Sequence, residues 1–234
     1  SNEHLGKRES LEGYFAAVTA MDLDVGRIID CVETSGLRND TLIIFTSDNG
    51  FSCGHHGFWG KGNGTLPLNM YDNSVKVPLI FSHPGTLPTG VTTSAMASGY
   101  DLAPTLLEYL GLPALQEERL PGQSFMPALR RPSGTGRESV VVYAEYGPTR
   151  MIRTREWKYV QRYGGPPDEL YDLVNDPDER ENLMAEPGHD GLVRDLQQQL
   201  VEWFAAYLDP ARDGATLPVT GYGQMMPLGA GVRR

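Results

Sequence analysis

A short apolar run that ends in acidic and amide side chains constrains the fold of this chain more than any other feature. Leu42–Phe45 reads Leu-Ile-Ile-Phe, and Ser47–Gly50 follows it with Ser-Asp-Asn-Gly. A continuous apolar run rich in β-branched and aromatic residues is typical of a strand buried on both faces, as in the interior of a parallel sheet. The sequence therefore predicts an α/β fold with a parallel or mixed sheet that contains this strand.

The polar residues that follow this run are candidates for a metal site. Open α/β sheets place their sites at the carboxyl ends of strands, and there the chain places the carboxylate of Asp48 beside the amide of Asn49. Two hard oxygen ligands suit Ca²⁺ or Mg²⁺ better than a soft metal. The alternative is that the segment is only a turn, because Asp, Asn and Gly dominate turns.

Motifs further along the chain point to a known family. Residues 53–64 read Cys-Gly-His-His-Gly-Phe-Trp-Gly-Lys-Gly-Asn-Gly, and a Val-Pro pair at 77–78 opens a second apolar strand. Together with the Ser-Asp-Asn-Gly segment, these motifs resemble in order and spacing the sulfatases of the alkaline-phosphatase-like superfamily. A helical pattern over residues 14–36 and the motifs within residues 151–177 extend the resemblance over about residues 10–208.

Two motifs of that family are absent from the sequence. Such sulfatases carry a Cys-x-Pro-x-Arg or Ser-x-Pro-x-Arg segment, whose first residue becomes the formylglycine nucleophile. Neither Cys31 nor Cys53 begins such a segment, and residues 82–86 have the proline but no arginine. The Asp-Asp pair that the family supplies to the metal is also missing. The resemblance therefore implies the C-terminal half of a sulfatase, with half of an active site and no activity as an isolated chain.

The resemblance assigns roles to four side chains. Asp48 and Asn49 would bind the divalent cation, Ca²⁺ in the first instance and Mg²⁺ as the alternative. Lys61, in the Trp-Gly-Lys motif, would contact the sulfate group, since a compact ammonium suits one oxygen of a tetrahedral anion. His56, in the Gly-x-His-Gly loop, would act near the leaving group or support the metal site. A solvated loop lysine and a structural histidine are the alternatives for the last two.

Further residues are weaker candidates for substrate contact. They are His55, Asn69, Tyr71, Asp72, Tyr146 and Arg150. His55 stands where the family often has an acidic residue. The residues at 69–72 could line a pocket or only fix the turn before the next strand. Arg150 would suit an anionic substrate group, although an ordinary surface role is the alternative for it and for Tyr146.

Composition excludes some classes of function. The 234 residues suffice for a sizeable core, in one domain or a domain with a small subdomain. A formal net charge of −10 argues against a nucleic-acid partner, which requires a basic face. An acidic surface also does not attract sulfated polyanions as a whole, so any anion must bind in a local pocket. No apolar stretch approaches the roughly 18 residues of a membrane span.

Periodicity divides the chain into four parts. Residues 1–115 are expected to belong to the catalytic α/β domain, 116–138 to a connector, 139–208 to a smaller subdomain and 209–234 to an irregular tail. The subdomain is predicted to be an antiparallel α+β unit, with four short strands and a closing amphipathic helix over residues 192–208. The four strands are predicted over residues 139–143, 151–154, 157–163 and 170–173.

Two classes of function stay open at this point. The first is an enzyme: part of a metal-dependent sulfatase that hydrolyses sulfate monoesters of sugars or small molecules, with phosphonate and phosphate ester hydrolases as related possibilities. The second is a stand-alone domain that binds a metal or an anion without catalysis. In both cases half of a sheet exposes a long apolar edge, which is prone to pairing. We therefore expect the chain to dimerise or to fold against another piece of protein.

Overall fold

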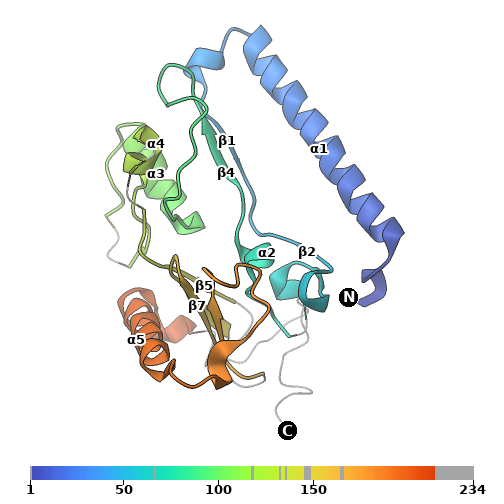
Figure 1. Ribbon diagram of the computed structural model, residues 1–234. Helices are drawn as coiled ribbons and strands as arrows, with labels where there is room; N and C mark the ends of the chain where they lie inside the picture. The colour runs from blue at the N-terminus through green and yellow to red at the C-terminus, as the bar shows by residue number, and fades with distance from the viewer. Residues whose placement is uncertain are drawn as a thin grey trace.

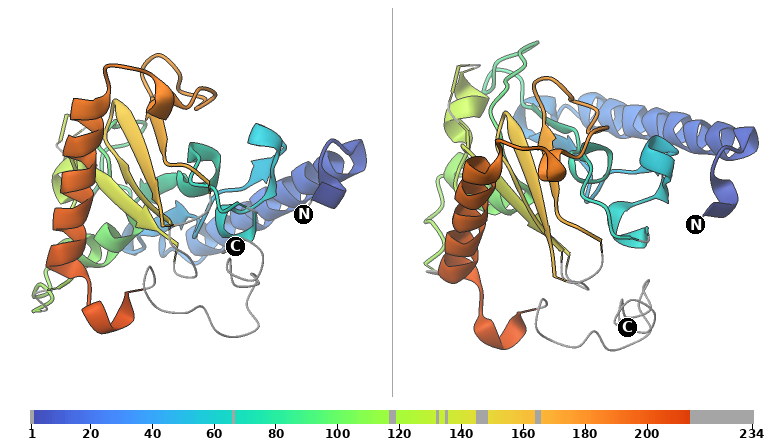
Figure 2. Two further views of the ribbon diagram at one scale, coloured as in Figure 1. Left: turned by 90° about the horizontal axis from the view of Figure 1, so that it is seen from below. Right: turned by 60° about the horizontal axis from the view of Figure 1, so that its bottom comes forward.

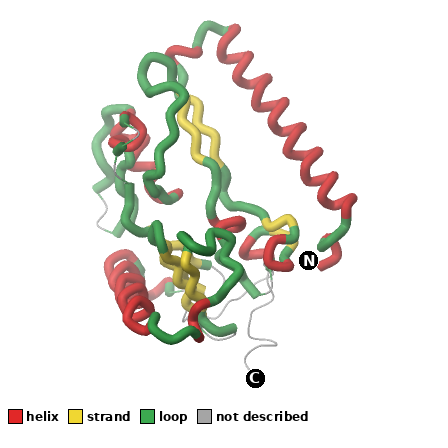
Figure 3. The backbone as a smooth tube through the Cα atoms, in the orientation of Figure 1, coloured by secondary structure: helices red, strands yellow, loops and turns green. Residues whose placement is uncertain are grey.

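Three small antiparallel sheets and five α-helices make up the part of the chain that the computed structural model describes (Figures 1 and 3). That part comprises residues 2–65, 67–116, 119–131, 133–134, 136–144, 149–163 and 166–213. The helices are α1 (Arg8–Thr34), α2 (Asp72–Val75), α3 (Leu102–Tyr109), α4 (Met126–Arg130) and α5 (Asp190–Tyr207). The strands are β1 (Ile43–Thr46), β2 (Ser52–Cys53), β3 (Trp59–Gly60), β4 (Leu79–Ser82), β5 (Val140–Tyr143), β6 (Thr149–Arg153), β7 (Trp157–Arg162) and β8 (Glu169–Asp172). None of the helices described is long and apolar enough to cross a membrane.

The prediction of a parallel sheet is wrong for the described residues. Strand β1, which contains most of the apolar run, pairs antiparallel with β4, and Thr46 lies opposite Leu79. This two-stranded ribbon is not buried on both faces, since Ile80 retains 56% of its exposure and Leu79 41%. The apolar run shows that both faces are suited to burial. The described residues add no further strand to this ribbon and cover it only in part, with Phe81 of β4 against Phe125.

Helix α1 confirms the predicted helix and leaves its apolar side uncovered. It ends where Gly36 takes a left-handed φ of 71° and the Leu37 amide donates to the carbonyl oxygen of Val32. No residue of α1 is buried, and Phe15 and Ile28 are 61% and 63% exposed. Figure 1 shows the helix standing apart from the rest of the molecule along most of its length.

The main core lies between the four-stranded sheet and α5. The strands follow the order β5-β6-β7-β8, each antiparallel to its neighbour, and α5 covers one face (Figure 2). That face contributes Val141, Ile152, Tyr159 and Leu170, and α5 contributes Leu196, Leu200 and Phe204. All four predicted strands and the closing helix are therefore present, while the exact domain boundaries stay a prediction. The tail begins with a short 3-10 turn (Pro210–Arg212), and residues 214–234 lie outside the described part.

The opposite face of the sheet holds the loop that precedes α2. Met151 and Val160 pack against Met70 from that loop. Next to them on the same face, the side chain of Lys158 is fully buried, and its ammonium donates to the carbonyl oxygen of Met70 over 3.0 Å. The sheet is thus covered on both faces, by a helix on one side and by an irregular loop on the other.

A buried ion pair fixes the segment at 116–138, which was expected to be a connector, to the start of α3. Asp101 is 1% exposed, and its carboxylate accepts from the Arg137 guanidinium, with 2.6 Å between Nε and Oδ2. The same carboxylate accepts from the backbone amides of Ser98 and Gln123. One side chain therefore ties the start of α3 to two positions, 123 and 137, of the segment that was expected to be a connector.

The packing of α5 leads to a stability prediction. Leu200 is 1% exposed inside the core, so Leu200→Ala should lower the free energy of unfolding by about 2–5 kcal/mol. Its neighbour Val201 is 55% exposed, and Val201→Ala should change that free energy by less than about 0.5 kcal/mol. Urea unfolding followed by circular dichroism measures both. Equal effects would show that α5 does not pack on the sheet with this face.

Candidate functional site

The segment at the carboxyl end of β1 carries the side-chain oxygens of Asp48 and Asn49. Oδ1 of Asp48 accepts from the backbone amide of Asn49 over 2.9 Å, and the amide group of Asn49 donates to the Gly50 carbonyl over 2.9 Å. The hydroxyl of Ser47 donates to the backbone oxygen of Asn49 over 2.7 Å. Oδ2 of Asp48 and Oδ1 of Asn49 then have no partner among the described residues. Asp48 is exposed and Asn49 half-buried.

Helix α2 holds this segment in place. The backbone amide of Gly50 donates to the carbonyl oxygen of Ser74 over 2.9 Å. A Cβ atom at position 50 would overlap the carbonyl oxygen of Asn73, so only glycine allows the two backbones to approach this closely. The chain bends at Asp48 within Ser47–Gly50, and these local contacts are compatible with a role for the two free oxygens.

The loop that carries His55 and His56 has an unusual backbone. It joins β2 to β3 and includes the 3-10 turn η3 (His55–Gly57), in which His56 has a φ of 53°. Positive φ is uncommon for a residue other than glycine. The ring of His56 lies parallel to that of Tyr71, with 3.6 Å between centroids and 5° between planes. His55 is exposed, whereas His56 is half-buried against Tyr71.

Burial lowers the pKa of His56 below its ordinary value, and the neighbouring His55 acts in the same direction. The carboxylates of Asp176 and Asp178 oppose this effect. A lowered pKa means that more of the imidazole is neutral near pH 7, and a neutral imidazole can accept a proton or a metal ion.

Lys61 follows β3 directly and is half-buried. Its ammonium has no ion-pair partner in the part of the chain that the structure describes. The next residue, Gly62, packs against the carbonyl oxygen of Asn69 and the side chain of Ser74. The loop that carries Lys61 is therefore anchored on the same turn and helix as the segment that carries Asp48.

Asn69 is a buried part of the turn that anchors the Lys61 loop, and it is not on the surface of that turn. It is 2% exposed, its side-chain amide donates to the Thr65 hydroxyl over 2.9 Å, and its backbone amide donates to Gly62 over 3.2 Å. The structure thus places Asn69 where it fixes the turn before α2. A substrate contact for this residue stays a prediction that requires the buried amide to be uncovered.

The other two weaker candidates lie away from this cluster or outside the described residues. Arg150, on β6, forms an ion pair with Asp213 over 2.5 Å and stacks over the ring of Phe204 at 3.7 Å. To bind a substrate anion it would have to exchange Asp213 for that anion. Tyr146 lies outside the described residues.

The oxygen atoms of Asp48 and Asn49 are the kind of ligand that a hard cation prefers, but they are too few to bind one. Ca²⁺ takes about six to eight oxygen ligands, and Mg²⁺ about six. Asp48 and Asn49 offer one free oxygen each, and the described residues hold no group of three or more His, Cys, Asp or Glu that could bind a metal ion. Further ligands are therefore needed from outside these residues.

Sequence reasoning missed a buried network of charges directly behind this site. Lys158 contacts Asp72 over 2.6 Å and also forms an ion pair with Glu179, which is 2% exposed. Arg153 contacts the other oxygen of Asp72 over 3.1 Å. A signal was present, because Lys158 alternates with apolar residues in a strand whose two faces are both covered.

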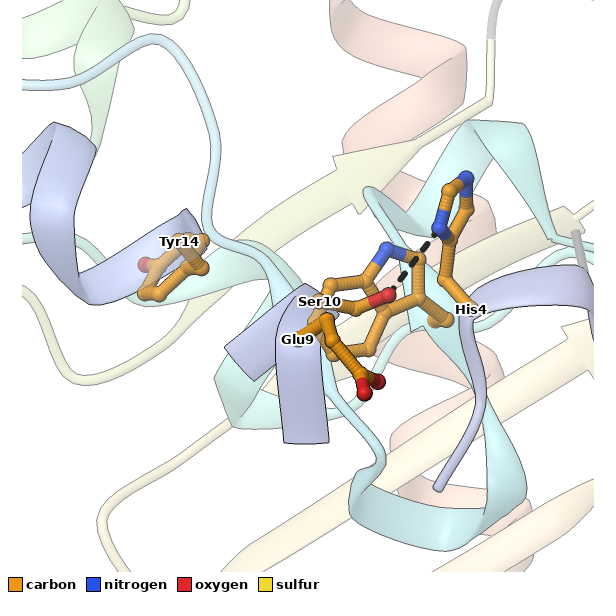
Figure 4. Close-up of a pocket in the computed structure, with 5 residues that line it drawn as sticks. His4, Glu9, Ser10 and Tyr14 are labelled. Carbon is orange, nitrogen blue, oxygen red and sulfur yellow. Dashed lines mark hydrogen bonds between the residues drawn. The ribbon is translucent and has the colours of Figure 1, made fainter. Parts of the chain in front are cut away.

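Sequence reasoning also missed a pocket of about 440 Å³ beside the Trp-Gly-Lys motif. It is lined by His4, Glu9, Ser10, Tyr14 and Trp59 (Figure 4). The imidazole of His4 faces Ser10, with 3.1 Å between Nδ1 and Oγ. The pocket brings the start of α1 to the loop that carries Lys61.

Comparisons with known proteins agree on one family. The model of the N-sulphoglucosamine sulphohydrolase C-terminal region matches residues 54–206. An N-acetylglucosamine-6-O-sulfatase of Bacteroides thetaiotaomicron is 29% identical over 213 residues, and a choline-sulfatase of Rhizobium meliloti is 35% identical over 187 residues. The matched parts cover 86% and 77% of this chain, but 37% and 34% of those proteins.

Solved structures give the same result. A protein in complex with its substrate D-glucosamine-2-N,6-O-disulfate superposes with a TM-score of 0.75 at 30% identity, over 86% of this chain and 41% of that one. A phosphonate monoester hydrolase of Agrobacterium radiobacter gives a TM-score of 0.71 at 28% identity, over 84% and 41%. The chain thus spans well under half of the length of these relatives.

The close approach of Gly50 to α2 predicts the effect of adding a methyl group there. Gly50→Ala should lower the free energy of unfolding by about 1–3 kcal/mol, because the new Cβ would force the two backbones apart. In Gly26→Ala, on α1, the new Cβ meets no atom, and removing a helical glycine should raise stability by up to about 1 kcal/mol. Thermal unfolding of the two variants tests this contrast. A stable Gly50→Ala protein would contradict the arrangement of the segment on α2.

Proposed function

The chain belongs to the sulfatase family, whose C-terminal region it matches, and we propose that it carries the C-terminal part of a metal-dependent sulfatase site. The proposed reaction is the hydrolysis of a sulfate monoester of a sugar or another small molecule. One observation carries the proposal. The oxygens of Asp48 and Asn49 and the ammonium of Lys61 that have no partner among the described residues lie on two loops, and both loops are anchored on the same short helix, α2.

Asp48 and Asn49 would hold a divalent cation, Ca²⁺ in the first instance and Mg²⁺ as the alternative. When bound, such a cation polarises the sulfate ester and stabilises negative charge on it. Two oxygen ligands are not enough for either ion. On this proposal the remaining ligands come from the family's Asp-Asp pair, which this sequence does not contain.

Lys61 would bind one oxygen of the sulfate. Cleavage builds charge on the sulfuryl oxygens and on the bridging oxygen, and a fixed ammonium stabilises that charge. The chain has 30 acidic and 20 basic residues, so an ammonium without an acidic partner is the kind of local group that can attract an anion to an acidic protein.

His56 would serve the leaving group. Its half-buried imidazole is able to hold or donate a proton at the bridging oxygen as that bond breaks. His55, which is exposed, would stay at the edge of the site. Arg150 and Tyr146 would contact more distant parts of the substrate.

The remaining length of the family's proteins would complete the site. This sequence has no Cys-x-Pro-x-Arg or Ser-x-Pro-x-Arg segment, so the formylglycine nucleophile would come from outside it. The same additional protein, or a second copy of this chain, would cover the exposed apolar side chains of α1 and of the β1–β4 ribbon. Phe15, Met21, Leu23, Ile28, Leu79 and Ile80 are among the exposed apolar side chains of that surface.

Two neighbouring functions define the alternatives. The likeness to a phosphonate monoester hydrolase favours a related reaction on a phosphonate or phosphate ester. The second alternative is a non-catalytic domain that binds a metal or an anion. The following test separates both alternatives from the proposed function, the first by the choice of substrate and the second by Ca²⁺ binding without turnover.

The proposal predicts where activity resides. With Ca²⁺ present, p-nitrophenyl sulfate should be hydrolysed by the longest product of the gene and not by residues 1–234 alone. In the active protein, Asp48→Ala and Lys61→Ala should each lower kcat/KM by about 100-fold or more. Lys7→Ala, at the exposed start of α1, should leave it unchanged.

Other outcomes of this assay assign the alternatives. Turnover by residues 1–234 alone would show that the nucleophile of the proposal is not required. Faster hydrolysis of a phosphonate monoester than of the sulfate would assign the chain to the related hydrolases. Binding of Ca²⁺ without turnover by any form would support the non-catalytic domain.

The exposed apolar side of α1 predicts self-association of the chain by itself. Sedimentation velocity should show dimers or larger species, because Phe15 and Ile28 would otherwise stay in water. The double variant Phe15→Ser, Ile28→Ser should shift the population toward the monomer. Val174→Ser, at a residue that is 64% exposed in the C-terminal region, is the matched control and should have no effect. A monodisperse wild-type monomer with cooperative melting would contradict this prediction.

A further inference from the structure

The orientation of the His56 ring depends on one contact. Tyr71 covers one face of the imidazole, with 3.6 Å between the ring centroids and nearly parallel planes. The backbone of His56 is left-handed, so its side chain leaves the loop in a direction that ordinary backbone would not give. Among the described residues, no hydrogen bond holds the imidazole of His56. The plane of the ring is therefore set mainly by Tyr71.

Tyr71 is in turn held by the C-terminal sheet. Its hydroxyl lies 3.4 Å from the hydroxyl of Tyr171, which is on β8 and 3% exposed. Tyr171 is itself fixed by Glu169, whose Oε2 lies 3.2 Å away. Burial raises the pKa of Tyr71, so its hydroxyl stays protonated at neutral pH.

The backbone next to Tyr71 is fixed from the same side. The amide of Asp72 donates to Oε2 of Glu179 over 2.6 Å, and the carboxylate of Asp72 contacts Lys158 and Arg153. These partners lie on β6, on β7 and just after β8. Groups of the C-terminal region therefore fix both the backbone beside Tyr71 and the hydroxyl at the far end of its ring.

We propose that Tyr71 is a positioning residue for His56, and that the C-terminal sheet sets the orientation of the His56 imidazole through it. The inference deepens the proposed function, because it assigns the C-terminal region a part in the proton transfer at the sulfate site. The ring of Tyr71 carries this role, and its hydroxyl supports the ring.

The physical reason lies in how strictly proton transfer depends on geometry. A displacement of about 1 Å in a reacting group can lower a rate about 100-fold. The ring of Tyr71 also keeps water from one face of His56, which contributes to the lowered pKa of that residue. The other charged or titratable groups that act on the pKa of His56 are His55, Lys158, Asp176 and Asp178.

Three variants in the longest product of the gene test the inference. Tyr71→Leu keeps an apolar side chain but removes the flat ring and the hydroxyl. Tyr71→Phe keeps the ring and removes only the hydroxyl. Tyr109→Leu is the matched control, because Tyr109 contacts a different histidine, His83, through its hydroxyl. Each protein is labelled with ¹³C-histidine, the His56 signal is assigned with His56→Gln, and kcat and KM for p-nitrophenyl sulfate are measured against pH.

In Tyr71→Leu, the His56 signal should lose the upfield shift caused by the tyrosine ring, and its pKa should rise toward about 6.5. The value of kcat should fall by about tenfold to 100-fold with little change in KM. The alkaline limb of the pH profile, along which a proton-donating His56 loses its proton, should move with the His56 pKa. Tyr71→Phe should restore the shift, the pKa and most of kcat. Tyr109→Leu should change the signal of His83 and not that of His56.

An unchanged His56 signal in Tyr71→Leu would overturn the inference, as would equal losses in the Leu and Phe variants. The spectroscopic result is independent of the reaction. If wild-type protein does not hydrolyse the sulfate but the His56 signal responds as described, the proposed function fails and the positioning by Tyr71 stands. If wild-type protein is active and Tyr71→Leu matches it in signal and kcat, the positioning fails and the proposed function stands.

Discussion

The buried ammonium of Lys158 is the feature on which the described structure depends most. An unpaired ammonium removed from water costs several kcal/mol, so this side chain is tolerated only with all its partners in place. Those partners are the carboxylates of Asp72 and Glu179 and the carbonyl oxygen of Met70. They come from two segments far apart in the sequence, one before α2 and one after β8. The charge is therefore neutralised only when the sheet, the turn at 69–72 and the segment at 176–179 have come together.

This requirement extends to the candidate site. Burial alone would raise the pKa of Asp72, but Lys158 and Arg153 outweigh it and lower that pKa, so the carboxylate stays ionised at neutral pH. Asp72 is also the first residue of α2, against which Gly50 and Gly62 pack. The loops that carry Asp48 and Lys61 thus take their positions from a helix that is itself fixed by the C-terminal sheet. A subdomain without any of the proposed metal or sulfate ligands determines where those ligands lie.

The sequence allowed the elements to be predicted better than their assembly. Helices α1 and α5 and strands β5 to β8 follow from local periodicity, which the side chains themselves dictate. The parallel sheet could not be predicted reliably, because an apolar run reports which faces can be buried and not which strand pairs with it. In the described residues β1 pairs only with β4, and antiparallel.

A similar limit applies to the site. The motifs located Asp48, Asn49, His56 and Lys61 in the chain, but their support by α2 and Tyr71 depends on contacts between distant segments.

One explanation accounts both for the exposure of the proposed site and for the exposed apolar side chains of α1 and β4. Electrostatic groups act most strongly on a substrate where water is excluded, yet Asp48 and His55 are exposed and Lys61 is only half-buried. On α1 and β4, large apolar side chains are exposed as well, although monomeric proteins rarely leave a broad apolar surface in water. The pocket between the start of α1 and Trp59 lies beside the loop that carries Lys61. On the proposed function, a protein that covered these apolar faces would also be placed to close the site.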